Sequence, residues 1–239
     1  KTGGGAFRKT LEDSKALARE MVQIGTLAGR DMSAVISDMD QPLGYAVGNA
    51  LEVKEAIATL NGNGPEDLRE LVLVLTSLMV VKAGKAKDIR EARILLVETL
   101  DSGKALQVMK EWIVAQGGTA EEVEHPDLLP QALCQEAVCA EKSGFVTKIH
   151  TEEIGRICML LGGGRAKKGD PIDLSVGLVL RKKVGDPVHS GESLAILHAN
   201  DREKLAEAKE RLLKAYEIKK EPVAVRPLIW KILDGTEAE

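Results

Sequence analysis

Residues 1–42 read KTGGGAFRKTLEDSKALAREMVQIGTLAGRDMSAVISDMDQP, and this stretch decides the fold. It opens on a loop with three consecutive glycines and continues with Leu17, Met21 and Ile24, which recur at the spacing of one helix face. The apolar run 34–36 follows and is closed by a polar loop ending in proline, a pattern typical of a buried strand. Loop, helix, strand and loop in this order predict an α/β fold.

The two loops of this stretch, residues 1–7 and 38–42, lie where α/β proteins bind ligands. Ligands bind outside the carboxyl ends of the strands in open α/β sheets, so we expect the loops to flank one crevice. The three glycines match neither the dinucleotide fingerprint nor the phosphate-binding P-loop, and a flexible terminus has them equally often. Because the chain begins at Lys1, inside a loop that normally follows a strand, we expect an N-terminal segment to be missing.

The composition excludes several classes of protein. The chain has 239 residues, of which 44% are hydrophobic, and it can bury one large core or two smaller ones. Only 3% are aromatic and 33 basic residues face 37 acidic ones, so nothing indicates nucleic-acid binding. No apolar run approaches the roughly 20 residues that span a bilayer, and three cysteines without metal-ligand spacing fit reduced thiols. We therefore expect a soluble, cytoplasmic protein that binds neither nucleic acid nor membrane.

Helical patterns dominate up to residue 118. Glycine-rich turns separate the helices that we expect over residues 43–60, 66–81, 88–99 and 102–116. The helix that begins at Glu66 is apolar on nearly every side, which favours burial in a core, with a subunit interface as the alternative.

Beyond residue 118 the pattern changes to short strands. An acidic stretch with two prolines, residues 119–132, reads as a connector between a domain over 1–118 and a compact α+β domain over 133–239. Within the second domain we expect strands over 137–140, 144–149 and 172–180, two short strands in 184–196, and helices over 151–161 and 201–219.

Two patterns in the second domain bear on function. Residues 184–196, VGDPVHSGESLAI, resemble a hairpin of biotinyl and lipoyl carrier domains, and this favours a barrel-like fold. Carriers need a lysine at the tip of a hairpin, usually between methionines, and the sequence has no such triplet, so a structural role is favoured. The four histidines are scattered and no hydrolase motif occurs, so we assign no catalytic residue.

The segment 38–55, DMDQPLGYAVGNALEVKE, has the least generic composition in the chain. Gly44 and Gly48 each cost a helix roughly 1 kcal/mol relative to alanine, which suggests a close approach of the backbone to another group. Backbone carbonyls near these glycines and the carboxylate of Glu55 could hold a hard cation, which prefers oxygen ligands. A solvated glutamate is the alternative.

Six motifs together resemble the C-terminal portion of the pyrimidine-nucleoside phosphorylase family, a relative of thymidine phosphorylase. They are KTGGGAF, SDMDQPLGYAVGNALEVKEA, VAQGG, LPQA, SGFV and LGGGRAKKGDPIDLSVGLVLRKKVGDPV, and they cover nearly the whole chain in the family's order. The resemblance implies that residues 1–118 are part of the phosphorylase α/β domain, with helices packed on a sheet. It also implies that 133–239 is a small α+β domain of the hammerhead or barrel-sandwich type.

The same resemblance implies a reaction and a set of partners. The family converts uridine, deoxyuridine or thymidine and inorganic phosphate reversibly to the free base and (deoxy)ribose 1-phosphate, and its members are homodimers. In the family, the residues that bind phosphate and base lie upstream of the segment that matches Lys1, so we expect this chain to be inactive alone. A non-catalytic binding or assembly module and a nucleoside-monophosphate phosphorylase are the alternative functions.

Few functional residues can be transferred to this chain from the resemblance. Phe7 matches a position that lines the base pocket. A potassium site is implied at the backbone carbonyls of Leu43 and Ala46 and the carboxylate of Glu55, with further ligands upstream.

Overall fold

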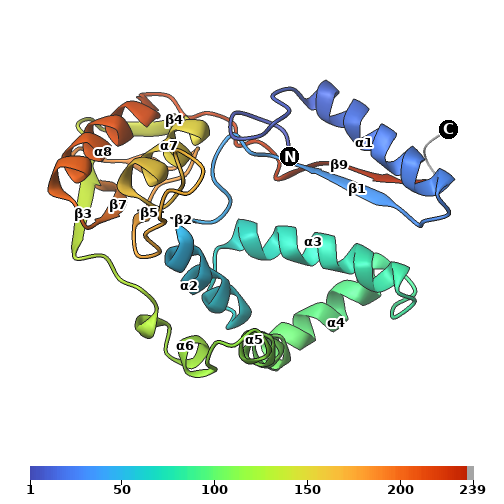
Figure 1. Ribbon diagram of the computed structural model, residues 1–239. Helices are drawn as coiled ribbons and strands as arrows, with labels where there is room; N and C mark the ends of the chain where they lie inside the picture. Colours follow the sequence, from blue (N-terminus) through green and yellow to red (C-terminus); the bar gives the residue numbers. More distant parts are fainter. Residues whose placement is uncertain (236–239) are drawn as a thin grey trace.

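The computed structural model describes residues 1–235, in which helices and strands are combined, consistent with the expected α/β fold (Figure 1). In chain order the elements are α1 (Leu11–Leu27), β1 (Ser33–Ser37), β2 (Ala46–Val47), α2 (Asn49–Leu60), α3 (Glu66–Lys82), α4 (Ile89–Asp101), α5 (Lys104–Ala115), α6 (Glu121–Glu124), η1 (Pro126–Leu128), β3 (Cys134–Cys139), β4 (Gly144–Ile149), α7 (Thr151–Leu161), β5 (Gly177–Leu180), β6 (Pro187–Val188), β7 (Ser193–Ala199), α8 (Arg202–Ala215), β8 (Tyr216–Lys219) and β9 (Ile229–Asp234). Every helix among these residues falls short of the length and apolarity that a bilayer crossing requires.

Strands β1 and β9 form a two-stranded antiparallel ribbon that brings the beginning and the end of the chain together (Figure 1). Its register runs from Ser33 opposite Asp234 to Ser37 opposite Ile229. Helix α1 contacts both strands, and its Thr10 N-cap accepts a hydrogen bond from the third helical residue.

The loops 1–7 and 38–42 lie side by side, whereas the crevice that they are expected to flank stays a prediction. Thr2 donates from its N–H to the Ser37 carbonyl at 2.9 Å and accepts from the Met39 N–H at 2.7 Å. Gly5 N also donates to the Met39 carbonyl, at 2.9 Å. The first residues therefore continue alongside the end of β1 and fix the loop that leads to β2.

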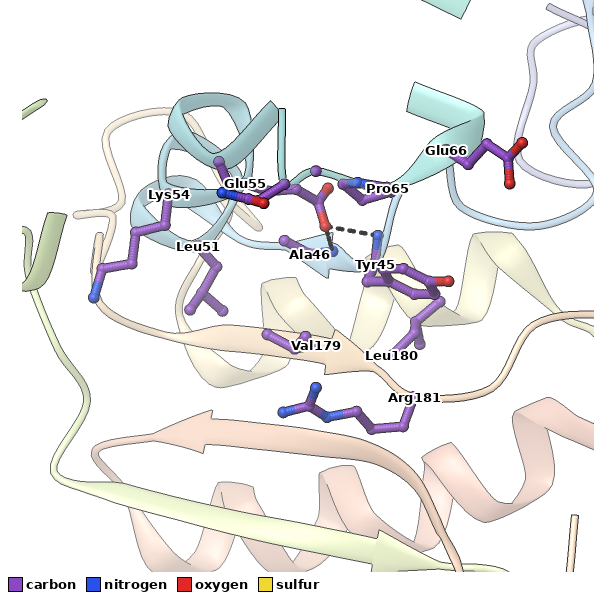
Figure 2. Close-up of a pocket in the computed structure, with 13 residues that line it drawn as sticks. Tyr45, Ala46, Leu51, Lys54, Glu55, Pro65, Glu66, Val179, Leu180 and Arg181 are labelled. Atoms are coloured by element: carbon purple, nitrogen blue, oxygen red, sulfur yellow. Dashed lines mark hydrogen bonds between the residues drawn. The ribbon is translucent and has the colours of Figure 1, made fainter. Parts of the chain in front are cut away.

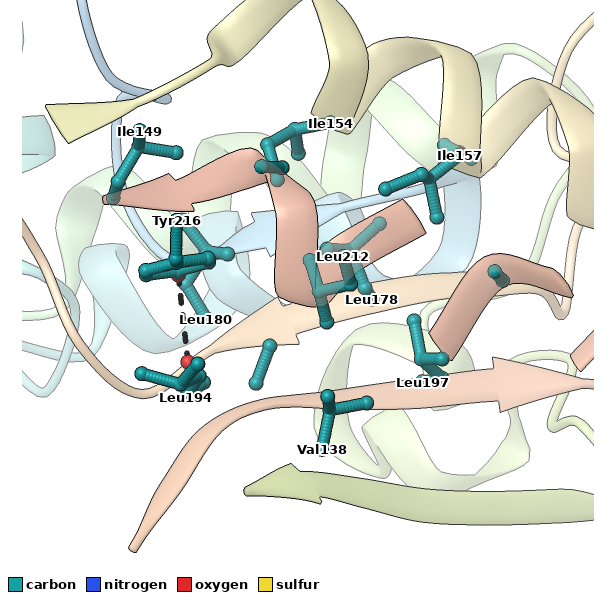
Figure 3. Packing of buried hydrophobic residues seen from close by; sticks show 14 of the residues in the cluster. Val138, Ile149, Ile154, Ile157, Leu178, Leu180, Leu194, Leu197, Leu212 and Tyr216 are labelled. Carbon is teal, nitrogen blue, oxygen red and sulfur yellow. Dashed lines mark hydrogen bonds between the residues drawn. The ribbon is translucent and has the colours of Figure 1, made fainter. Parts of the chain in front are cut away.

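The main core lies in the C-terminal half, where β2 joins the sheet of order β2-β5-β7-β3 (Figure 1), and β4 lies between β6 and β8 in a second sheet. Helices α7 and α8 pack together and contribute the apolar faces that complete this core. Leu178, Leu197 and Leu212 are fully buried in it (Figure 3). Cys158 is buried in the same core, and burial raises the pKa of its thiol to about 11.

Helix α3 is less buried than its sequence predicts. Only Leu71, Leu73 and Ser77 are buried on it, whereas Met79 is 67% exposed. The expectation that this helix lies inside a core is therefore wrong within the described residues. Its apolar side chains face outward because among residues 1–235 only α4 makes extensive contact with it.

Several expected boundaries are corrected by strand pairing. The helix expected over 43–60 begins only at Asn49, because residues 46–47 pair with β5. The strand expected over 172–180 begins only at Gly177, where its pairing with β7 begins. The closing helix ends at Ala215, since the next four residues pair with β4 as β8.

Strand pairing also crosses the expected domain boundary. β9 lies in the segment 133–239 but pairs with β1, and β2 lies in 1–118 but pairs with β5. The segment 119–132 contains the short helices α6 and η1. Its role as a connector, and the division at its ends, stay predictions, but β9 adjoins the N-terminal segment.

Candidate cation and ligand site

The turn over residues 41–46, between β1 and α2, is the candidate site. Glu55 reaches it from α2, and its Oε1 accepts hydrogen bonds from Tyr45 N at 2.8 Å and Ala46 N at 3.0 Å (Figure 2). One carboxylate thus holds two consecutive backbone amides. The turn is fixed by this contact rather than by regular secondary structure.

Lys183 holds the same turn from the C-terminal half. Its ammonium donates to the carbonyls of Pro42 and Gly44, the second at 2.7 Å, and to Asp67 Oδ2 at 3.0 Å. Asp67 Oδ2 in turn accepts from Gly44 N at 3.1 Å. Only 12% of the Lys183 side chain is exposed, so the ammonium and the carboxylate form a largely buried ion pair.

The carbonyls of Leu43 and Ala46 are left out of these contacts. Leu180 N donates to the Tyr45 carbonyl at 2.8 Å, so this carbonyl faces β5. Residues in an antiparallel pair alternate between facing the partner strand and facing away from it, so the Ala46 carbonyl points away from β5. Among residues 1–235, no hydrogen bond reaches the Leu43 carbonyl.

Glu55 is half-buried beside a cavity of about 550 Å³ that Tyr45, Lys54 and Arg181 also line (Figure 2). Burial raises the pKa of the Glu55 carboxyl and the charge of Asp67 adds to this, whereas the two backbone hydrogen bonds and the charge of Lys183 oppose it. A carboxylate whose charge is penalised by burial is stabilised by a nearby cation. The electrostatics around Glu55 therefore favour a positive ion.

The chemistry of these donors fits a hard cation. One carboxylate and two backbone carbonyls supply oxygen only, which suits alkali and alkaline-earth ions better than zinc. In the described part of the chain no three His, Cys, Asp or Glu side chains gather into a metal-binding group. A cation here would therefore depend on backbone oxygens.

The close approaches predicted at Gly44 and Gly48 are confirmed. A Cβ on Gly44 would lie 2.1 Å from Glu55 Oε2, and the backbone has a φ of +65°. A Cβ on Gly48 would lie 2.5 Å from the Val176 carbonyl, where β2 meets the residues that lead into β5. Both glycines allow the turn to pack directly against its neighbours.

The structure brings together three of the four predicted site residues. Leu43, Ala46 and Glu55 belong to one turn and the helix that follows it. Phe7 lies apart, at the tip of the loop 1–7, with a fully exposed side chain. Its contact with a base stays a prediction.

Sequence analysis missed Lys183 and Asp67. Lys183 contacts a carbonyl 139 residues away, and Asp67 lies in an acidic first helix turn like many others. Neither residue belongs to a local pattern that signals a ligand. Only tertiary structure reveals their contacts with the turn.

The hairpin resembling a carrier domain lacks the lysine that a carrier needs at its tip. Residues 189–192, HSGE, form the turn between β6 and β7, closed by a hydrogen bond from Glu192 N to the His189 carbonyl at 2.9 Å. No lysine lies at this tip. The hairpin accordingly contributes to the core, where Val188 and Leu194 are buried.

Two family models match the chain in succession. The a/b domain of a glycosyl transferase family matches residues 1–106, and the pyrimidine nucleoside phosphorylase C-terminal domain matches residues 145–219. The first contains the turn and Glu55, and the second contains Lys183. The hydrogen bonds that Glu55 and Lys183 make with the turn therefore join segments that two different family models describe.

Curated relatives agree with both models. Proteins named pyrimidine-nucleoside phosphorylase from Staphylococcus aureus strains bovine RF122 / ET3-1, USA300 and NCTC 8325 are each 56% identical over 200 residues, which cover 84% of this chain. The matched region is 46% of each relative, so the chain spans about half their length. The chain belongs to the pyrimidine-nucleoside phosphorylase family, of which it represents a C-terminal portion.

Proposed function

We propose that this chain contributes to the reversible phosphorolysis of pyrimidine nucleosides, which yields the free base and (deoxy)ribose 1-phosphate. The observation that carries the proposal is the 56% identity over 200 residues to proteins named for this activity. The order of the two matched domains supports it. Uridine, deoxyuridine or thymidine and inorganic phosphate are the proposed substrates.

The chemistry of the reaction explains what such a chain contributes. Cleavage of the bond at C1′ passes through an oxocarbenium-like transition state with an anionic leaving base, which a dry, positively lined cleft stabilises. The loops 1–7 and 38–42 would form one wall of that cleft, with Phe7 exposed toward the base. The groups that bind phosphate and base would come from the portion of the relatives that this chain does not match.

We also propose a monovalent cation, potassium, at the turn 41–46. Leu43 and Ala46 would hold it through their carbonyls and Glu55 through its carboxylate. When bound, the ion supplies positive charge that fixes the turn and offsets the burial of Glu55. It takes no part as a reagent.

Activity can be tested on this chain and on a fusion that joins the N-terminal portion of a Staphylococcus aureus relative to it. We expect no release of uracil from uridine and phosphate by the chain alone, and steady release by the fusion. Ultraviolet absorbance of the separated base measures both. Turnover by the chain alone, or a folded fusion without activity, would contradict the proposal.

The homodimer and the cytoplasmic location implied by the resemblance are proposals as well. Sedimentation equilibrium of the fusion measures the first, and fractionation of cells that produce it measures the second. A monomeric fusion with full activity would exclude a role for the dimer in catalysis.

A further inference from the structure

Some carbonyls of the turn 41–46 accept hydrogen bonds from the protein, and the others have no donor among residues 1–235. Lys183 occupies those of Pro42 and Gly44, and Leu180 N occupies that of Tyr45. The carbonyls of Gln41, Leu43 and Ala46 remain, and the last two are the ones proposed above to bind a cation. Both proposed ligand carbonyls are therefore among those that the protein's own donors leave unused.

We propose that Lys183 is a positioning residue that fixes the turn so that the Leu43 and Ala46 carbonyls are available to a cation. The inference rests on the cation site proposed above. An ammonium group has three N–H donors and no acceptor, and here all three have partners: two carbonyls and the Asp67 carboxylate. Each N–H of the ammonium thus points at one acceptor, which fixes the orientation of the group.

Further contacts hold the Lys183 ammonium and the turn in fixed positions relative to each other. The ammonium lies 5.5 Å from the centre of the Tyr45 ring, within the range of a cation–π contact. The neighbouring Val184 N donates to Gln41 Oε1 at 2.9 Å, so two consecutive residues of the C-terminal half hold the turn. Asp67 fixes the ammonium and the Gly44 amide with one oxygen atom.

The positive charge of the Lys183 ammonium also limits where a metal cation can bind. An ion at the Pro42 or Gly44 carbonyl would meet the Lys183 ammonium at close range and would be repelled. Glu55, on the other hand, offers negative charge next to Ala46. Lys183 therefore directs a cation toward Glu55 by occupying two of the alternative oxygens.

Lys183→Met in the fusion tests the proposal. The readout is the potassium chloride concentration that gives half of the rise in melting temperature, with choline chloride maintaining ionic strength. We expect this concentration to increase about tenfold, as for other residues that orient metal ligands. Hydrogen exchange in choline chloride should also become faster at the amides of residues 44–46.

Lys148→Met is the matched control, because the Lys148 side chain is 57% exposed and its one ion pair among residues 1–235 is with Glu217 at 3.6 Å. Asp67→Asn keeps both carbonyl contacts of Lys183 but removes the ion pair, so it should shift the potassium midpoint in the same direction by less. If Lys183→Met does not fold, Asp67→Asn provides the test in its place. A lower melting temperature with an unchanged potassium midpoint in either variant would overturn the proposal.

The outcomes separate this inference from the proposed function. A fusion that releases uracil but whose potassium midpoint is insensitive to both substitutions refutes the role of Lys183 alone. A folded fusion that releases no uracil refutes the proposed reaction, whereas the potassium midpoint still tests Lys183.

Discussion

Gly44 has the least space for a side chain in the candidate site. Its φ is +65°, and a Cβ would lie 2.1 Å from Glu55 Oε2. Gly84 has nearly the same φ, +66°, but nothing lies within 4 Å of its Cβ position. The two glycines therefore share the backbone cost of an alanine and differ only in what the methyl group meets.

We predict that Gly44→Ala destabilises the chain more than Gly84→Ala. Gly84→Ala should cost about 1–2 kcal/mol of unfolding free energy from the left-handed backbone alone. Gly44→Ala should cost about 1–3 kcal/mol more, because Glu55 must move away from the Tyr45 and Ala46 amides and leave them unpaired. Urea unfolding measures both, and equal losses would show that Glu55 moves without cost.

At the scale of elements, β9 provides the only strand that pairs with β1 among the described residues. An isolated two-stranded ribbon is only marginally stable, and the core under this one is small. The larger core around Leu178, Leu197 and Leu212 does not include either strand (Figure 3). The ribbon and the large core should therefore respond differently to the loss of β9.

We predict that a chain ending at residue 221 loses hydrogen-exchange protection in β1 but keeps it in β5 and β7. Without β9, the amides of β1 have no ladder partner, whereas β5 and β7 keep theirs. Mass spectrometry of peptides from each strand measures the difference. Loss of protection in all three strands would show that the ribbon and the large core unfold together.

Sequence reasoning succeeded where the signal is local. The period of Leu17, Met21 and Ile24 predicted α1, and the unusual glycines near Glu55 predicted a close approach that the structure confirms. It failed where distant pairing decides: residues 216–219 continue a helical pattern, yet β4 draws them into a strand. Lys183 could not be found because its partners lie on segments more than a hundred residues away.

At the scale of the whole molecule, several helices expose apolar side chains. Ile24 on α1 is 64% exposed, Met79 on α3 is 67% exposed, and Trp112 on α5 is 61% exposed. Exposed apolar side chains of this size favour association in water when they lie close together on a surface.

We predict that this chain alone binds a hydrophobic dye and associates as its concentration rises. Replacing Ile24 and Met79 by lysine should reduce both effects, because it places charge on two of the exposed faces. Val225→Lys is the control, since Val225 is also exposed, at 62%, but lies outside the helices. Dye fluorescence and sedimentation velocity measure the outcome, and unchanged values in the double variant would contradict the explanation.

The pairing of β1 with β9 has a consequence for how the chain is made. Ser33 and Asp234 contact each other across 201 residues of sequence. On the ribosome, β1 emerges long before β9 has been translated, so the backbone N–H and C=O groups of β1 stay without their strand partner while the intervening residues are made. Pairing over such a separation forms slowly, and the ribbon can assemble only after the 201 residues that lead from Ser33 to Asp234 have been translated.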